Sequence, residues 1–254
     1  MLVVPEGGSF SYHNLTMVMD GHTGIEHSIP IAPIYRDVLA LWGGSQTSYT
    51  PTLIVGYGGI WGEHFWYQKT NVWEKSRLLN FTPRPLVDSR ARRRLMIPDD
   101  DFGFIENAKT ASALRDAGVK VNLGAHGQLQ GLGAHWELWM LAQGGMTPLQ
   151  ALRAATLNGA EYLGMAKDLG SLEAGKLADL IVLEKNPLDN LQNTEFISMV
   201  MKNGRLYDAE TMNEIGNHPH TRLPFYWDNA KTSEAFVWKG PGVGFGEVQC
   251  GCMQ

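Results

Sequence analysis

The sequence predicts an α/β protein with parallel strands, and three features of the chain carry this prediction. Short apolar runs at Ile25–Ile29, Tyr49–Val55 and Val119–Leu123 have the length and composition of buried strands. Segments with apolar residues at helical spacing lie between them, at 34–42 and 99–117. The alternation of strand and helix along one chain favours parallel strands joined by right-handed crossovers.

The first half of the chain opens with an expected strand at Leu2–Pro5, which ends in a loop that begins at Glu6. After the second strand, Ile34 to Trp42 forms the first expected helix, and Gly43-Gly44 caps it. From 60 to 98 the periodicity is lost in a segment rich in tryptophan, tyrosine and proline, where we expect a long excursion with short helices. Such an excursion is either a lid over a site or packing against the rim of the fold.

The second half begins with an amphipathic helix over 99–117 and continues with helices at 135–143 and from Pro148 to about Leu163. Thr147 is the expected N-cap of the last of these, with Pro148 at its first position. Short strands then follow at 170–172, 178–183 and 197–207, with Asn203-Gly204 as a hairpin turn. The chain is thus divided into an α/β part (1–168), a small β unit (169–216) and an irregular tail (217–254).

Composition restricts the kinds of partner. The net charge of −5 over 254 residues argues against a nucleic-acid or anionic-membrane partner, because both need clustered lysine and arginine. The one basic run, Arg90 to Arg94, precedes the acidic triplet 99–101, and a solvated loop or an ion-paired helix start accounts for it. No apolar run approaches the length of a membrane span. Cys250 and Cys252 are spaced for neither a common disulfide nor a zinc knuckle.

The N-terminus enters the first expected strand directly, without a signal peptide. We therefore expect the chain to be the C-terminal part of a longer protein. The compartment stays unknown, and as expressed the chain is expected in the cytoplasm.

Two of the expected strands end in a histidine. His27 follows Gly24-Ile25-Glu26, and His126 lies in Gly124-Ala125-His126-Gly127, where two glycines allow a sharp turn. The C-terminal ends of parallel strands are where ligands and catalytic groups gather. The interpretation depends on whether the two histidines share one site; the alternative is that each is a hydrogen-bonded histidine at the rim.

A longer set of residues resembles the amidohydrolase superfamily, in particular its imidazolonepropionase-like and prolidase-like branch. The resemblance lies in ordered segments: Gly145-Met146-Thr147-Pro148, Ala151 to Thr156, Asn158-Gly159-Ala160, Leu163-Gly164, Gly170 to Leu183, Asn186-Pro187-Leu188 and Lys202-Asn203-Gly204-Arg205.

The resemblance implies a partial TIM-like (β/α) barrel, about the last four β/α units, with a small C-terminal β-sandwich appendage. It also implies one or two divalent metals at the strand ends. In that frame His27 is the metal ligand of the sixth strand, and His126 stands on the eighth strand where the family normally has aspartate. Glu6 is the nearest ligand-capable residue of the fifth strand, and the paired histidines of the first strand have no counterpart.

His27, His126 and Glu6 are therefore the expected ligands of a divalent metal, zinc first, with manganese, iron, nickel or copper as alternatives. His126 is also the expected catalytic residue, because a neutral imidazole can take the proton of an attacking water near neutral pH. Four further residues are expected around the substrate: His22, His135, Glu137 and Tyr57. For His22 an ordinary turn histidine is the alternative, and for Glu137 a charge that complements its own helix N-terminus.

The expected function is a metal-dependent hydrolase of amide or other C–N bonds, or of esters, acting on a small-molecule or peptide-like substrate. The alternative is a catalytically incomplete half-barrel that acts only as a self-associating structural or binding unit. In either case exposed sheet edges predict a homo-oligomer, a dimer or larger.

Overall fold

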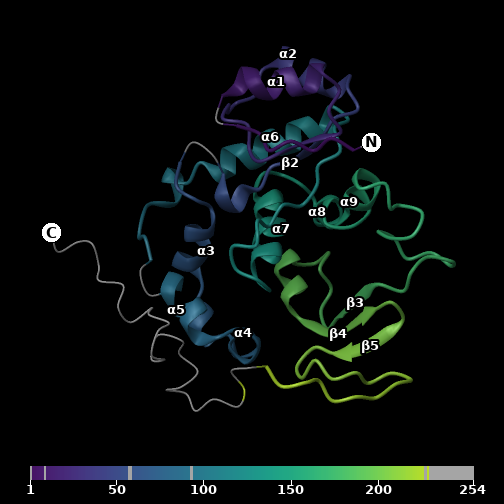
Figure 1. The fold of residues 1–254 in the computed structure, drawn as a ribbon. Coiled ribbons are helices and arrows are strands. Elements are labelled where there is room, and N and C mark those ends of the chain that lie inside the picture. The colour runs from purple at the N-terminus through teal and green to yellow at the C-terminus, as the bar shows by residue number, and fades with distance from the viewer. Residues whose placement is uncertain (1, 9, 57–58, 92–93, 226–227, 229–254) are drawn as a thin grey trace, which may run out of the picture.

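A computed structural model describes residues 2–8, 10–56, 59–91, 94–225 and 228. Two N-terminal helices lie at one end, helices α6 and α7 lie in the middle, and an antiparallel sheet lies at the other end (Figure 1). The helices are α1 (Ser11–Met19), α2 (Arg36–Gly43), α3 (Glu63–Lys69), α4 (Ser76–Phe81), α5 (Arg84–Ala91), α6 (Phe104–Asp116), α7 (Gly133–Gln143), α8 (Pro148–Ala154) and α9 (Leu157–Tyr162). Short 3₁₀ turns are η1 (Leu53–Val55), η2 (Val72–Glu74), η3 (Asp99–Asp101) and η4 (Leu191–Glu195), and the strands are β1 (Gly24–Glu26), β2 (Ser48–Thr50), β3 (Leu180–Leu183), β4 (Ile197–Lys202) and β5 (Arg205–Asp208).

A parallel layer forms from four chain segments. β1 and β2 pair in parallel, with Ile25 opposite Tyr49. An isolated parallel bridge joins Glu6 to Glu26 on one side, and another joins Tyr49 to Val121 on the other. The segments therefore lie in the order 2–6, β1, β2 and 119–123, which confirms the parallel arrangement predicted from the sequence.

These strands are shorter than the sequence predicts, and the backbone at their ends gives the reason. The predicted strand Ile25–Ile29 stops at Glu26 because His27 has a left-handed φ of 73°. The predicted strand Tyr49–Val55 stops at Thr50, because Thr52 has a φ of 50° and starts the turn η1. The predicted strand 2–5 carries no bridge, since the bridge falls on the adjacent Glu6, and 119–123 carries a single bridge at Val121.

The aromatic excursion packs into the core instead of standing away from it. Trp66 and Tyr67 on α3 are buried, and the Trp66 ring stacks on Trp136 of α7 at a centroid distance of 6.4 Å. Trp139 of the same helix meets Trp66 edge-on at 5.0 Å. Packing against the central helix thus accounts for these aromatic residues, although Trp61 is 48% exposed.

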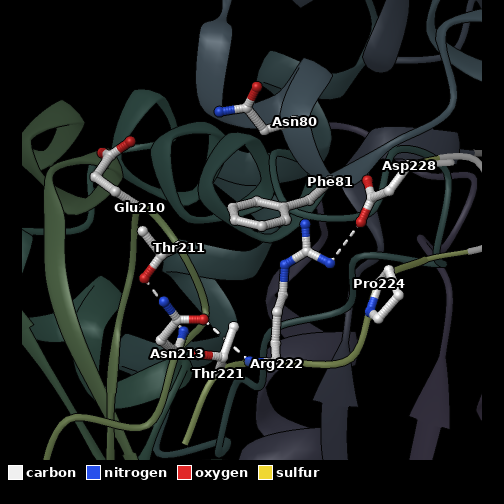
Figure 2. Close-up of a pocket in the computed structure, with 9 residues that line it drawn as sticks. All are labelled: Asn80, Phe81, Glu210, Thr211, Asn213, Thr221, Arg222, Pro224 and Asp228. Atoms are coloured by element: carbon white, nitrogen blue, oxygen red, sulfur yellow. Dashed lines mark hydrogen bonds and ion pairs between the residues drawn. The ribbon is translucent and has the colours of Figure 1, made fainter.

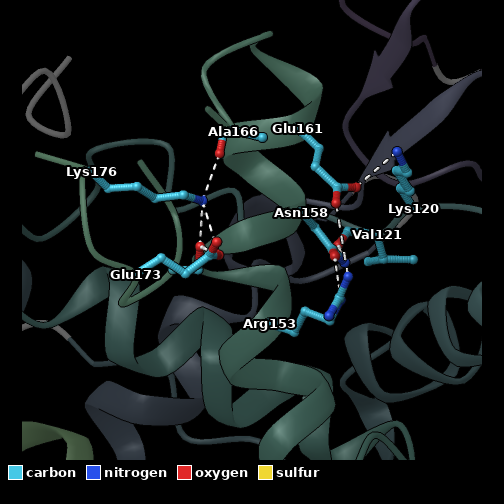
Figure 3. Close-up of polar contacts among 9 residues, drawn as sticks. Lys120, Val121, Arg153, Asn158, Glu161, Ala166, Glu173 and Lys176 are labelled. Carbon is cyan, nitrogen blue, oxygen red and sulfur yellow. Dashed lines mark hydrogen bonds and ion pairs between the residues drawn. The ribbon is translucent and has the colours of Figure 1, made fainter. Parts of the chain in front are cut away.

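The predicted helix from Pro148 to about Leu163 is two helices. Its predicted start is confirmed, because Thr147 Oγ1 accepts from Gln150 N and Gln150 Oε1 accepts from Thr147 N. α8 then ends at Ala154 and α9 begins at Leu157. The break lets α9 bind the segment 119–123: the Asn158 side-chain amide donates to Val121 O at 2.9 Å, and Glu161 pairs with Lys120 at 2.8 Å (Figure 3).

The C-terminal part forms an antiparallel sheet in the order β3–β4–β5. Asn203 and Gly204 both have positive φ, 55° and 75°, and the predicted hairpin turn is confirmed. The predicted strand at 170–172 is wrong: Gly170 has a φ of 90° and turns close to α9, where an added Cβ would lie 2.5 Å from Ala160 Cβ.

Cys250 and Cys252 lie outside the described residues, as does nearly all of the tail beyond Phe225. Within the described part of the chain, no helix has both the length and the apolar character that a membrane crossing requires.

Candidate functional site

Three strand ends of the parallel layer carry non-glycine residues in the left-handed region: His27, Thr52 and His126, with φ of 73°, 50° and 52°. This conformation costs a residue with a Cβ about 1–2 kcal/mol, and such strain collects at functional sites. The segment after 119–123 lies very close to Thr52, because a Cβ on Gly124 would meet Thr52 Oγ1 at 2.5 Å. We call these three strand ends the histidine edge.

The histidine edge brings together the three residues that the sequence predicts as ligands. His27 is buried, and its Nε2 lies 3.1 Å from Glu6 Oε1. The rings of His27 and His126 meet edge-on at a centroid distance of 5.2 Å and an interplanar angle of 65°. The Glu6 side chain is 69% exposed, so the pair opens to solvent on that side.

The protonation state of His27 follows from its surroundings. Burial lowers its pKa below the ordinary value of 6.5, Glu6 opposes this shift, and the neighbouring His126 adds to it. Because the burial effect is the largest, His27 is a neutral imidazole near neutral pH. This is the form that can ligate a metal.

A polar chain connects His126 to the excursion. His126 Nδ1 lies 3.2 Å from Gln128 Oε1, and Gln128 Nε2 donates to Glu63 Oε1 at 3.2 Å. Because the Gln128 oxygen is an acceptor, His126 Nδ1 donates to it, which in the neutral ring leaves the lone pair on Nε2. Glu63 is buried and also pairs with Arg90 at 3.2 Å. Arg90, the first residue of the basic run, thus pairs with Glu63 beside the histidine edge and not with the acidic triplet 99–101.

Gln128, Glu63 and Arg90 were not predicted as site residues. Glu63 and Arg90 lie in the excursion without periodicity, 65 and 38 positions from Gln128. The one usable signal in the sequence was an isolated acid in an aromatic segment. Only the packing of α3 and α5 brings them beside the loop 124–131.

The remaining predicted site residues lie elsewhere or have other partners. His22 lies before β1, at the opposite end of the strand from His27, and its Nδ1 contacts Met17 O at 2.9 Å. His135 turns toward the β unit, with Nδ1 3.1 Å from Thr194 Oγ1. Tyr57 lies outside the described residues.

Glu137 lies in the core under the histidine edge. It is fully buried, and its two carboxylate oxygens accept from Leu53 N at 2.8 Å and Ile54 N at 2.9 Å. It therefore caps the turn η1 that follows Thr52, and not its own helix. Burial raises its pKa to about 8, against the opposing effect of the two N–H donors.

The histidine edge fits a metal in the kind of donor but not in the arrangement of the donors. Two imidazoles and one carboxylate converge, which are preferred zinc ligands. Nonetheless, in the described ranges no group of three or more His, Cys, Asp or Glu side chains is arranged to hold a metal ion. His27 Nε2 is instead hydrogen-bonded to Glu6. The edge is thus a partial ligand set.

Comparison with known proteins gives the family. Residues 97–207 match the sequence model of the Amidohydrolase family. Ochratoxinase of Aspergillus niger is 31% identical over 179 residues, which are 64% of this chain and 36% of that protein. Imidazolonepropionase of Shouchella clausii is 32% identical over 120 residues, or 44% of this chain and 27% of that protein.

Solved structures agree with the sequence matches. A Xaa-Pro dipeptidase with bound methionine in its active site aligns with a TM-score of 0.57 and 26% identity, covering 82% of this chain and 45% of the dipeptidase. The crystal structure of A. niger ochratoxinase aligns with a TM-score of 0.53 and 21% identity, covering 82% of this chain and 42% of that one.

Residues 97–207 thus match the Amidohydrolase family, and the fold is similar to that of solved amidohydrolase proteins. The superfamily resemblance predicted from the sequence is confirmed. The chain spans 36% of the length of ochratoxinase and 45% of the dipeptidase.

Proposed function

We propose that this chain forms about half of the (β/α) barrel of a metal-dependent hydrolase that cleaves amide or other C–N bonds, or esters, in small-molecule or peptide-like substrates. The observation that carries the proposal is the convergence of His27, His126 and Glu6 at one edge of four parallel segments. Relatives named ochratoxinase, imidazolonepropionase and Xaa-Pro dipeptidase support a hydrolytic role.

His27, His126 and Glu6 would hold the metal, zinc in the first place. When bound, the metal lowers the pKa of a water molecule and polarises the substrate carbonyl. His27 contributes a neutral imidazole held by burial, and Glu6 contributes a carboxylate at the solvent side. His126 presents its Nε2 lone pair, because Gln128 holds its Nδ1. That nitrogen can either ligate or accept a proton.

Further strands would complete the ring. Within the described residues, segment 2–6 is paired with a neighbouring segment on one side only, whereas the outer side of 119–123 is covered by α8 and α9, because Leu123 N donates to Ala154 O and Asn158 donates to Val121 O. Leu2, Val3 and Val4 are 51%, 39% and 41% exposed, which is unusual for an apolar run beside a parallel layer. A second copy of the chain that pairs at the 2–6 edge would cover this run and explain the expected homo-oligomer.

The same exposed edge favours a second candidate. A half-barrel that self-associates through segment 2–6, without chemistry at the histidine edge, needs no metal. The partial ligand set is consistent with this alternative.

The experiment that separates the two is a measurement of bound metal together with mass in solution. We expect the purified chain to bind a divalent metal that His27→Ala and His126→Ala abolish, while His22→Ala, a histidine at the other end of β1, retains it. Light scattering should give a dimer or larger. An oligomer that binds no metal supports the structural role, and a metal-free monomer rejects both.

A hydrolysis screen completes the test. Aryl amides, N-acyl amino acids and X-Pro dipeptides are suitable substrates, because they sample the bond classes of the proposal. Activity that survives His27→Ala would show that the reaction does not occur at the histidine edge.

A further inference from the structure

A pocket of about 580 Å³ lies between the α/β part and the β unit, apart from the histidine edge. Its walls come from α4, from residues 130–135 and from the β unit around Glu195 and Phe196. The apolar part of the lining consists of Leu78, Phe81, Leu132, Phe196 and Ile197. This volume is in the range of small-molecule sites, which combine apolar walls with a few polar groups.

Glu195 supplies an unsatisfied acceptor. Its side chain is 17% exposed, and its Oε2 pairs with Lys75 at 2.5 Å. Its Oε1 is buried and has no hydrogen-bond partner among the described residues. A buried carboxylate oxygen without a donor is costly, so a donor from a ligand would be favoured here.

His135 supplies a second acceptor, and its hydrogen bonds define the tautomer. Thr194 Oγ1 donates its proton to Leu191 O at 2.9 Å and accepts from Trp139 Nε1 at 3.1 Å. With the Thr194 proton on Leu191 O, His135 Nδ1, which lies 3.1 Å from the same Oγ1, carries a proton and donates it. The Nε2 of this pocket-lining imidazole is left with its lone pair. Burial also lowers the pKa of His135, which keeps the ring neutral.

The charged side chains of the pocket also favour a ligand that donates hydrogen bonds. Lys75 is neutralised by Glu195, and Arg77 is paired with Glu210. Glu184, also in the lining, adds a third carboxylate to these two pairs. The lining thus has one more negative than positive group, with His135 neutral.

We propose that this pocket binds an organic ammonium ion with an apolar or aromatic body, its N–H donors directed at Glu195 Oε1 and His135 Nε2 and its body against Phe81, Leu132 and Phe196. The proposal does not depend on the reaction at the histidine edge.

A neighbouring hollow does not offer the same chemistry. There Arg222 is already paired with Asp228 at 2.6 Å (Figure 2). The Arg222 guanidinium also lies 4.4 Å from the centroid of the Phe225 ring. The charges of that hollow are satisfied by the protein itself.

The test compares three probes that share one body: 2-phenylethylammonium, 2-phenylethanol and 3-phenylpropionate, titrated against the full chain by calorimetry. We expect the ammonium to bind at least about tenfold more tightly than the alcohol, because a charge-assisted hydrogen bond is replaced by a neutral one. Equal binding of ammonium and alcohol, tighter binding of the carboxylate, or no binding of the ammonium at millimolar concentration would each overturn the proposal.

Variants locate the site. Glu195→Gln and His135→Phe should each weaken the ammonium about tenfold or more while leaving the alcohol nearly unchanged. Glu161→Gln, a partly exposed carboxylate on α9 outside the pocket, is the matched control and should bind like the parent chain. Unchanged ammonium affinity in both pocket variants, with melting temperatures that show them folded, would contradict the assignment.

Discussion

The parallel layer and the antiparallel β unit both contain left-handed residues, but of different kinds. In the hairpin between β4 and β5, Asn203 and Gly204 take up positive φ, and both residue types tolerate it. At the histidine edge the same conformation falls on His27, Thr52 and His126, and the β-branched Thr52 is the least suited to it. The hairpin uses the conformation to turn, whereas the edge is strained where the candidate chemistry lies. It follows that contacts with the core must offset the backbone strain at the histidine edge.

Glu137 is the clearest support for the strained edge, and its removal should give the largest effect. Glu137→Ala leaves the N–H groups of Leu53 and Ile54 without acceptors in a buried place, so we expect a loss of about 3 kcal/mol or more in the free energy of unfolding. The measurement is urea denaturation. In the β unit, Glu210→Ala removes only a surface pair with Arg77 and should cost at most about 1 kcal/mol. Similar losses in both variants would remove the contrast.

The pH dependence of stability should also report on Glu137. The pKa of Glu137 is raised from 4.5 to about 8, so the folded state holds a proton that the unfolded state releases between these values. Stability should therefore fall as pH rises from about 5 to 8, by up to about 1.4 kcal/mol per pH unit from this group. Glu137→Gln has no such proton, so the stability difference between parent and variant should shrink with rising pH. Parallel curves over pH 5–8 would show that Glu137 does not titrate in this range.

The strain itself should give a smaller effect of opposite sign. His126 is exposed, so His126→Gly releases the left-handed Cβ without leaving a cavity and should stabilise the chain by about 0.5–1 kcal/mol. His126→Ala retains the Cβ and should lack this gain. Asn203→Gly in the hairpin should change stability by only a few tenths of a kcal/mol, since asparagine already tolerates the turn. Thermal unfolding of the three variants measures these changes in stability. An equal gain in stability in all three would mean that the histidine edge is not more strained than the hairpin.

Much of the fold could be predicted because the signals are local. The capping box at Thr147, the Asn203-Gly204 hairpin and the helices α2, α6 and α7 follow from residue type and spacing within a few positions. Two of the strand ends that carry candidate chemistry, His27 and His126, were also visible, because a histidine after a short apolar run is a local pattern. The predictions of the strand lengths and of a continuous helix to Leu163 were wrong. At these places contacts between segments distant in the sequence override local propensity.

The sequence by itself determined the α/β class, the resemblance to the amidohydrolase superfamily and the two histidines that end parallel strands. Only the tertiary structure decided that His27 and His126 meet, that Glu137 holds the turn η1, and that Gln128, Glu63 and Arg90 extend the edge into the excursion. It also decided that His135 belongs to a different pocket. The physical reason is that these contacts join side chains that are tens of residues apart along the chain, and their distances are set by how helices and strands pack, which no spacing in the sequence records.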